Sequence, residues 1–217
     1  MLESQIGLSK KLMLKAAFSL SNMYTHKQQQ IESVSLYAKY RFLSRDAVHK
    51  HFRAAVFLNT VISRNNLMYD ELTGDGDHSV FQAGIVATQL LNKLALSGTL
   101  ALTEIINGER WQKYSGPRNF GYQGINYSFS SGYLVFPRKY TSYKQPNFNI
   151  YLEILGGVGL DRRFSYTDLA PAFQVILNSN TKINVGYRFQ VDGDVYRMAR
   201  NGVYFSFERT FLNALKK

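Results

Sequence analysis

The residues best suited to chemistry in this sequence are its histidines and the side chains beside them. His49 and His51 have the His-x-His spacing of a metal pair, but no third ligand follows, so a solvated turn is the expected setting. His78 and Ser79 are the residue types of a base and a nucleophile, as in a lipid-modifying barrel enzyme, and Asp75 and Asp77 precede them. Nothing in the sequence fixes their geometry. An acidic surface loop is therefore the favoured interpretation, and no enzyme is expected.

Two Asp-Gly-Asp segments, at residues 75–77 and 192–194, offer the oxygen ligands that calcium prefers. Neither is followed by the further spaced ligands of a known calcium loop. The chain has no cysteine for a thiolate site and no glycine-rich phosphate motif. We therefore expect no metal and no cofactor.

A third candidate for function is a set of charged side chains that share one face of alternating segments. Two interpretations stay open for them. The cations pair with the carboxylates and fill a narrow interior, or they form the electropositive wall of a lumen that admits or binds anions. The set expected to line the lumen is Lys15, Lys39, Arg41, Arg53, Glu153, Lys182, Arg188 and Glu208.

The segments that position this face alternate between apolar and polar residues, which is the pattern of β-strands. The clearest is 34–42, where Val34, Leu36 and Phe42 alternate with residues such as Lys39 and Arg41. About ten such segments can be traced, most of them long enough to span a bilayer. Residues 2–8 are short and alternate weakly, and the tail of an earlier strand is one interpretation of them. A helix over 82–96 is the main local alternative.

The connections between these segments tend to be short and long in turn. Short turns are predicted at 44–50, 91–94 and 178–180, and long loops at 65–78 and 107–121. This alternation is typical of outer-membrane barrels, which have short periplasmic turns and longer external loops. The basic connection at 137–146 is longer than a periplasmic turn usually is.

Length and charge restrict the function classes. The 217 residues suffice for a single domain, 1–217, and the net charge is +11. The basic residues are spread through strands and turns, so nucleic acid is not an expected partner. The expected partners are membrane lipid and the phosphate groups of lipopolysaccharide. No apolar run is long enough for a transmembrane helix, and the first residues lack the features of a signal peptide.

The C-terminal segment resembles the sorting signal of bacterial outer-membrane proteins. A polar residue, Arg200, is followed by Gly202 and by aromatic residues at Phe205 and Phe207, and Phe211 ends the segment. The resemblance implies that this strand is recognised by the insertion machinery and closes the barrel against the first strand. The chain departs from the typical signal because residues 212–217 follow the last aromatic residue.

The chain as a whole resembles bacterial outer-membrane barrels of the kind common in Bacteroidota. It is loosely similar to the transporter proteins of the meta-pathway phenol-degradation type. Segments 7–12, 182–189 and 202–211 carry the likeness. It implies an all-β, antiparallel up-and-down transmembrane barrel in the outer membrane, with about ten strands here or about twelve in the full protein. A soluble barrel, with its apolar face turned inward, stays open because the alternation does not reveal which face points in.

Two functions follow from this fold. The first is a narrow channel or transporter for small solutes, with anions favoured by the basic face. The second is a non-conducting structural or accessory barrel that docks with protein partners in a larger outer-membrane complex.

Overall fold

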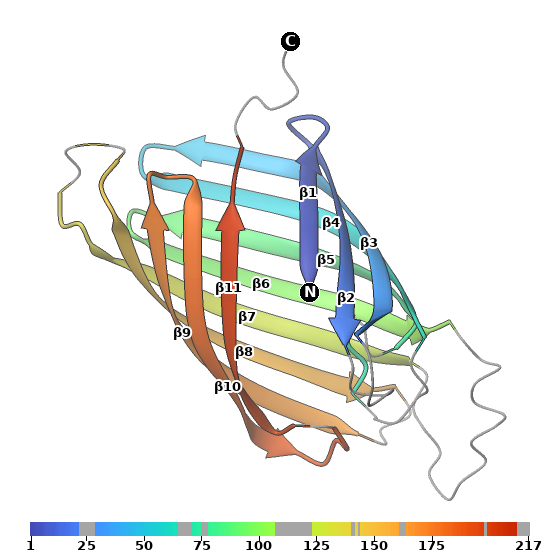
Figure 1. Ribbon diagram of the computed structural model, residues 1–217. Helices are drawn as coiled ribbons and strands as arrows, with labels where there is room; N and C mark the ends of the chain where they lie inside the picture. Colours follow the sequence, from blue (N-terminus) through green and yellow to red (C-terminus); the bar gives the residue numbers. More distant parts are fainter. Residues whose placement is uncertain are drawn as a thin grey trace, which may run out of the picture.

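Alternation with period two produces strands almost wherever the sequence predicts them. The computed structural model describes residues 1–21, 29–64, 71–74, 78–106, 123–139, 142, 144–160, 164–197 and 199–211. Within them, eleven strands form one antiparallel sheet in which each strand pairs with its neighbours in sequence (Figure 1). The all-β, up-and-down prediction is confirmed. The strands are β1 (Leu2–Gly7), β2 (Leu12–Ser21), β3 (Gln30–Ala47), β4 (Lys50–Ser63), β5 (Val80–Leu91), β6 (Leu94–Ile105), β7 (Gln123–Phe136), β8 (Asn147–Gly159), β9 (Ser165–Leu177), β10 (Thr181–Gly193) and β11 (Asn201–Arg209).

The structure adds one strand to the predicted set and decides between two local alternatives. There are eleven strands rather than about ten, because residues 2–7 form a short strand of their own that pairs with β2. The helix considered over 82–96 does not form, since this region holds the hairpin of β5 and β6. Its alternation is blurred because Val80 and Val86, on the otherwise polar face, are apolar. No helix in the described part of the chain is long and apolar enough to cross a membrane.

Apart from the long β7–β8 connection (137–146), short turns lie at one end of the sheet and longer connections at the other. We call the end with the β1–β2, β3–β4, β5–β6, β7–β8 and β9–β10 connections the turn end, and the other the loop end. The β3–β4 turn is shorter than the predicted 44–50, because β3 continues to Ala47 and only Val48 and His49 separate the strands. His49 and Asn92 adopt left-handed φ angles of 59° and 51°. Such angles allow these tight hairpin turns.

The register sorts the side chains onto two faces of opposite character. Val34 lies opposite Ile62, and Val56 lies opposite Ile85, so the apolar positions form one continuous face. The other face carries polar and small residues from β2 to β10 that line a common cavity, which makes it the concave side. The apolar face is therefore the convex, exposed one. Its exposed side chains include Phe18, Leu36, Leu58, Ile85, Leu100, Phe129, Ile150, Phe173, Val185 and Phe205.

The sheet curls but does not close. Its edges are β1 and β11, both exposed along their whole length and not paired with each other. Because the strands alternate in direction and their number is odd, the two edges run the same way (Figure 1). Met1, beside β1, and Arg188, on β10, line one cavity, so the two halves of the sheet face each other across the interior. Closure into a barrel remains a prediction.

The concave face has one compact apolar region, which lies at the loop end. Leu72, from the β4–β5 connection, and Val195, from the β10–β11 connection, are buried against the ends of the strands. We call this region the plug. It consists of Val61, Leu72, Val80, Ile105, Phe164, Tyr166 and Val195.

Candidate functional site

The charged residues predicted to line a lumen all lie on the concave face. The register shows this directly. Lys39 lies opposite Met13 and Phe57, which line the concave face, and Lys182 lies opposite Glu208. The structure separates the residues into groups along the strand direction. Lys39, Arg41 and Arg53 gather at the turn end, whereas Arg188 belongs to the loop end.

Two of the predicted cations are paired at the edges of the sheet. Lys15 Nζ lies 2.9 Å from Glu3 Oε2 of β1, and Lys182 Nζ lies 2.9 Å from Glu208 Oε1 of β11. Both pairs are partly exposed, so each contributes little to stability. Glu3 is not among the predicted site residues, because residues 2–8 alternate too weakly for a polar face to be assigned.

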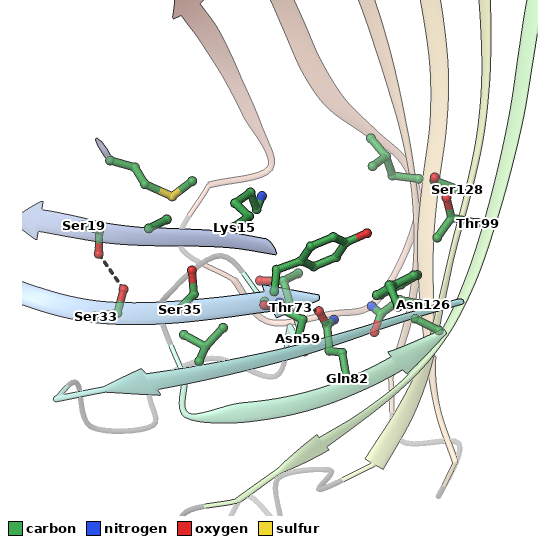
Figure 2. Close-up of a pocket in the computed structure, with 18 of the residues that line it drawn as sticks. Lys15, Ser19, Ser33, Ser35, Asn59, Thr73, Gln82, Thr99, Asn126 and Ser128 are labelled. Carbon is green, nitrogen blue, oxygen red and sulfur yellow. Dashed lines mark hydrogen bonds between the residues drawn. The ribbon is translucent and has the colours of Figure 1, made fainter. Parts of the chain in front are cut away.

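A polar cavity of about 470 Å³ occupies the middle of the concave face (Figure 2). Side-chain amides connect its wall across four strands. Asn59 Nδ2 donates to Gln82 Oε1 at 3.0 Å, and Gln82 Nε2 donates to Thr103 Oγ1 at 2.9 Å. Thr103 in turn donates to Asn126 Oδ1. Such a wall offers donors and acceptors to water or a small polar solute.

A second pocket, of about 380 Å³, lies at the turn end of the concave face. We call it the basic pocket. Its charged lining comes from the β1–β2 turn and from β3 and β4, and consists of Lys10, Lys11, Lys39, Arg41 and Arg53. The sequence indicated the last three by their alternation. It gave no signal for Lys10 and Lys11, which lie in a turn.

A buried ionic network closes the loop end beside the plug. Asp168, on β9, has no exposed side-chain surface and accepts hydrogen bonds from Arg188 Nε at 2.7 Å and Arg197 Nη1 at 2.7 Å. Glu71 Oε1 lies 2.7 Å from Arg188 Nη2 and 3.3 Å from Arg197 Nη1. The hydrogen bonds to Asp168, aided by the charge of Glu71, raise the pKa of Arg197 although burial opposes the shift. Two cations and two carboxylates thus compensate each other.

Of the four residues in this network, only Arg188 was predicted to line the lumen. Asp168 shares the polar face of β9 and could have been found by extending the alternation back from Leu169. Glu71 and Arg197 lie in connections, where no periodicity operates, and their contact spans 126 positions of the sequence.

The loop end of the interior is occupied rather than open in the described part of the chain. Leu72 and Val195 fill it with apolar side chains, and Asn126 Nδ2 donates to the main-chain oxygen of Leu72 at 2.8 Å. Leu72 and Val195 are therefore held against the wall from inside.

The histidines and Ser79 do not form a catalytic arrangement among the described residues. Ser79 Oγ donates to the Ser63 main-chain oxygen at 3.1 Å and accepts from its nitrogen at 2.9 Å, so its hydroxyl has a structural role. His78 is buried, and neither of its ring nitrogens has a hydrogen-bond partner in the described structure. Asp75 and Asp77 lie outside the described residues.

His51 has a partner that the sequence interpretation overlooked. Its Nδ1 lies 2.6 Å from Asp46 Oδ1, because Asp46 and His51 are opposite each other in the β3–β4 hairpin. Arg53 Nη2 lies 3.3 Å from the same carboxylate oxygen. Asp194 accepts a hydrogen bond from the Ser165 nitrogen at 3.0 Å, which gives the second Asp-Gly-Asp segment a structural contact. Within the described ranges, no cluster of three or more metal-ligating side chains occurs.

Most of the residues predicted to form a C-terminal sorting signal lie on the exposed edge strand. Gly202, Phe205 and Phe207 belong to β11, and Phe211 follows it. Phe205 and Phe207 lie opposite Val185 and Ile183 of β10 and point to the convex face. Residues 212–217 lie outside the described part. Comparisons with family models, with curated proteins and with solved structures found no match to this chain.

Proposed function

We propose that this chain forms an integral β-barrel of the bacterial outer membrane and that its basic interior carries small anionic solutes along a narrow path. The observation that carries the membrane part of the proposal is the outward direction of the apolar face. Leu36 and Phe205, on strands far apart in the sheet, are 65% and 68% exposed. A continuous exposed apolar surface is unfavourable in water but suits contact with lipid.

The alternative of a soluble barrel requires the opposite orientation. Its apolar side chains would fill the interior and its charged residues would face solvent. In this chain the interior instead holds Lys15, Asn59, Gln82 and Asp168, and its buried apolar cluster, as far as the described residues go, is the plug. The strand lengths also favour a membrane, since β4 to β10 each have 12 to 14 residues. About 9–11 residues are enough to cross a bilayer.

The proposal includes closure of the sheet between β11 and β1. The two strands run in the same direction, so the closing ladder is parallel. Odd-stranded membrane barrels exist, so an odd count is no obstacle. In this arrangement lipid contacts the convex face, the loop end faces outward, and the turn end faces the periplasm.

The proposed solute follows from the distribution of charge on the concave face. Carboxylates pair with the cations at the edges and at the loop end, but the basic pocket is left with an excess of positive charge. Rings of cationic side chains favour anions in narrow pores. A small interior of this kind restricts the solute to low molecular weight.

Conductance in planar lipid bilayers tests the proposal. We expect single-channel currents that prefer anions, and a lower preference in the Lys39→Glu and Arg41→Glu variants. Lys144→Glu makes the same charge change in the exposed β7–β8 connection and should leave the preference unchanged. If the inserted wild-type protein carries no current, transport is ruled out.

A second candidate is a non-conducting barrel that docks with partner proteins in the outer membrane. The plug and the ionic network favour it, because they occupy the loop end of the interior. Stoichiometric co-purification of one envelope protein, together with absent conductance, would select this function over the first.

A further inference from the structure

The cations of the basic pocket differ from those elsewhere on the concave face. Lys15, Lys182, Arg188 and Arg197 each have a carboxylate within 4.0 Å. In the described part of the chain, no ion pair is formed by the pocket residues Lys10, Lys11, Lys39 and Arg41. Arg53 shares the single carboxylate of Asp46 with His51. The pocket thus concentrates positive charge that its own described residues do not neutralise.

The turn that carries two of these cations is held in place. Arg41 donates its main-chain N–H to the Lys11 oxygen at 2.8 Å, and its guanidinium donates to the Lys10 oxygen. Ser9 Oγ accepts hydrogen bonds from the nitrogens of Lys11 and Leu12 at 3.2 and 3.0 Å. These contacts hold the main chain of the turn against β3. A site ordered before binding loses less entropy when a ligand enters.

The remaining lining is mixed in character. Thr88 and Ser9 bring hydroxyl groups, while Met13 and Val86 bring apolar surface. The volume of about 380 Å³ falls in the range of small-molecule sites, about 300–1,000 Å³. An inorganic ion would leave most of it unfilled. A charged head with a short carbon body matches both the lining and the size.

We propose that the basic pocket binds a phosphate monoester dianion. Such a group carries close to two negative charges near neutral pH and presents three strong acceptor oxygens. Arg guanidinium groups match phosphate oxygens with paired N–H donors, and Lys adds point charge. The carbon part of the ester lies against Met13 and Val86. The binding site itself does not depend on transport. This inference rests on the proposed function only where it identifies the bound ester as a transported solute.

The phosphate has two possible sources, a soluble ester or a lipid headgroup. Titration calorimetry with glycerol 3-phosphate, on the full chain in detergent micelles, tests the soluble source. We expect saturable binding that weakens at least about tenfold in Lys39→Gln and in Arg41→Gln, since each removes a charged hydrogen bond. Lys182→Gln, which alters a paired cation of the same face, should change the affinity less than about twofold. Arg53→Gln supplies an independent pocket variant, and retained β-type circular dichroism shows that each variant is folded.

Nanodiscs that contain phosphatidic acid or only phosphatidylcholine test the lipid source. Enrichment of phosphatidic acid around the wild type but not around the pocket variants, without glycerol 3-phosphate binding, assigns the site to a lipid headgroup. Absence of both interactions, or equal binding by wild type and pocket variants, overturns the proposal. Conductance is measured separately. Phosphate binding without current would refute the channel proposal and support the phosphate site. Anion-selective current without phosphate binding would support the channel and refute the phosphate site.

Discussion

Asp168 has no exposed side-chain surface and lies at the loop end of the concave face. Its carboxylate holds Arg188, from the neighbouring strand, and Arg197, from a connection. Loss of one partner leaves the others buried with uncompensated charge, which costs more than the intact network contributes. The network therefore fixes where the β10–β11 connection lies, whatever its net effect on stability.

Asp168→Asn should lower the free energy of unfolding by about 3 kcal/mol or more, because two cations would then share Glu71 alone. Urea unfolding of the protein in detergent micelles measures the change. Adding Arg197→Met to the same chain should restore part of the loss. Lys182→Met, at the exposed Lys182–Glu208 pair, is the control and should cost less than about 1 kcal/mol. Equal losses at both sites would contradict a buried network.

His78 is the second residue at which burial has a measurable consequence. Burial lowers the pKa of His78 from 6.5 to about 4, and the nearby main chain of Glu71 opposes only part of the shift. The unfolded chain therefore binds a proton more readily than the folded one. Stability is fully present above pH 6.5 and is lost as the pH falls toward the folded-state pKa.

Between about pH 7.5 and about pH 4.5, His78 should account for a loss of about 2–3 kcal/mol in the free energy of unfolding. His78→Leu removes the titrating group and two unpaired nitrogens, so this variant should lack that part of the pH dependence. Urea unfolding of both proteins across this pH range gives the comparison. Parallel stability curves for the two proteins would show that His78 does not titrate as a buried group.

At the scale of elements, β1 and β11 decide whether the sheet becomes a barrel. Each central strand is paired on both sides, whereas these edges leave a row of main-chain groups unpaired within the described structure. Unpaired edges are not tolerated inside a bilayer, because no water is there to satisfy them. If the convex face contacts lipid, each edge must therefore be paired, and pairing of β1 with β11 is the closure that we propose.

Cysteine pairs across the two edges test direct closure. Ser4 lies on the convex face of β1, and Val203, Phe205 and Phe207 lie on the convex face of β11. Ser4→Cys combined in turn with cysteine at 203, 205 and 207 should give a disulfide in at least one pair, since bridged Cα atoms lie about 4.4–6.8 Å apart. Ser4→Cys with Phe173→Cys, on β9, should not react. If no edge pair forms while the control behaves as expected, β1 and β11 are not neighbours.

Sequence reasoning was most successful at the scale of elements. The alternation of Val34 and Leu36 with Ser35 and Tyr37 is set by the side chains of consecutive residues, so strands follow from the sequence directly. It was weakest at β1, which has few alternating residues, and at β5, where the predicted strand formed but Val80 and Val86 make both faces apolar and had left a helix open. The candidate site was found where it lies on strands and was missed where Glu71, Arg197 and Lys10 come from connections.

At the scale of the whole molecule, the convex surface separates a membrane protein from a soluble one. An arginine at the centre of a lipid-facing strand costs about 2–4 kcal/mol, and near the interface it costs about 0–1 kcal/mol. A surface substitution in water usually changes stability by less than about 0.5 kcal/mol. The cost should therefore depend on depth only if the convex face contacts lipid.

Leu100→Arg, in the middle of β6, should lower the free energy of unfolding from lipid vesicles by about 3 kcal/mol. Val191→Arg, near the loop end of β10, is the matched control and should lower it by less than about 1 kcal/mol. Both positions are exposed on the convex face, so packing effects are comparable. Equal and small effects of the two substitutions would refute lipid contact.

The sequence by itself determined the strands, their up-and-down order and the gathering of charge on one face, because each depends on the types of residues close together in the chain. It did not determine which face points inward, since alternation looks the same from either side. Only the tertiary structure turned the apolar face outward, placed Lys10 and Lys11 beside Arg41, and brought Glu71 to Arg197. These outcomes depend on the curvature of the sheet and on contacts between distant segments, which no local pattern encodes.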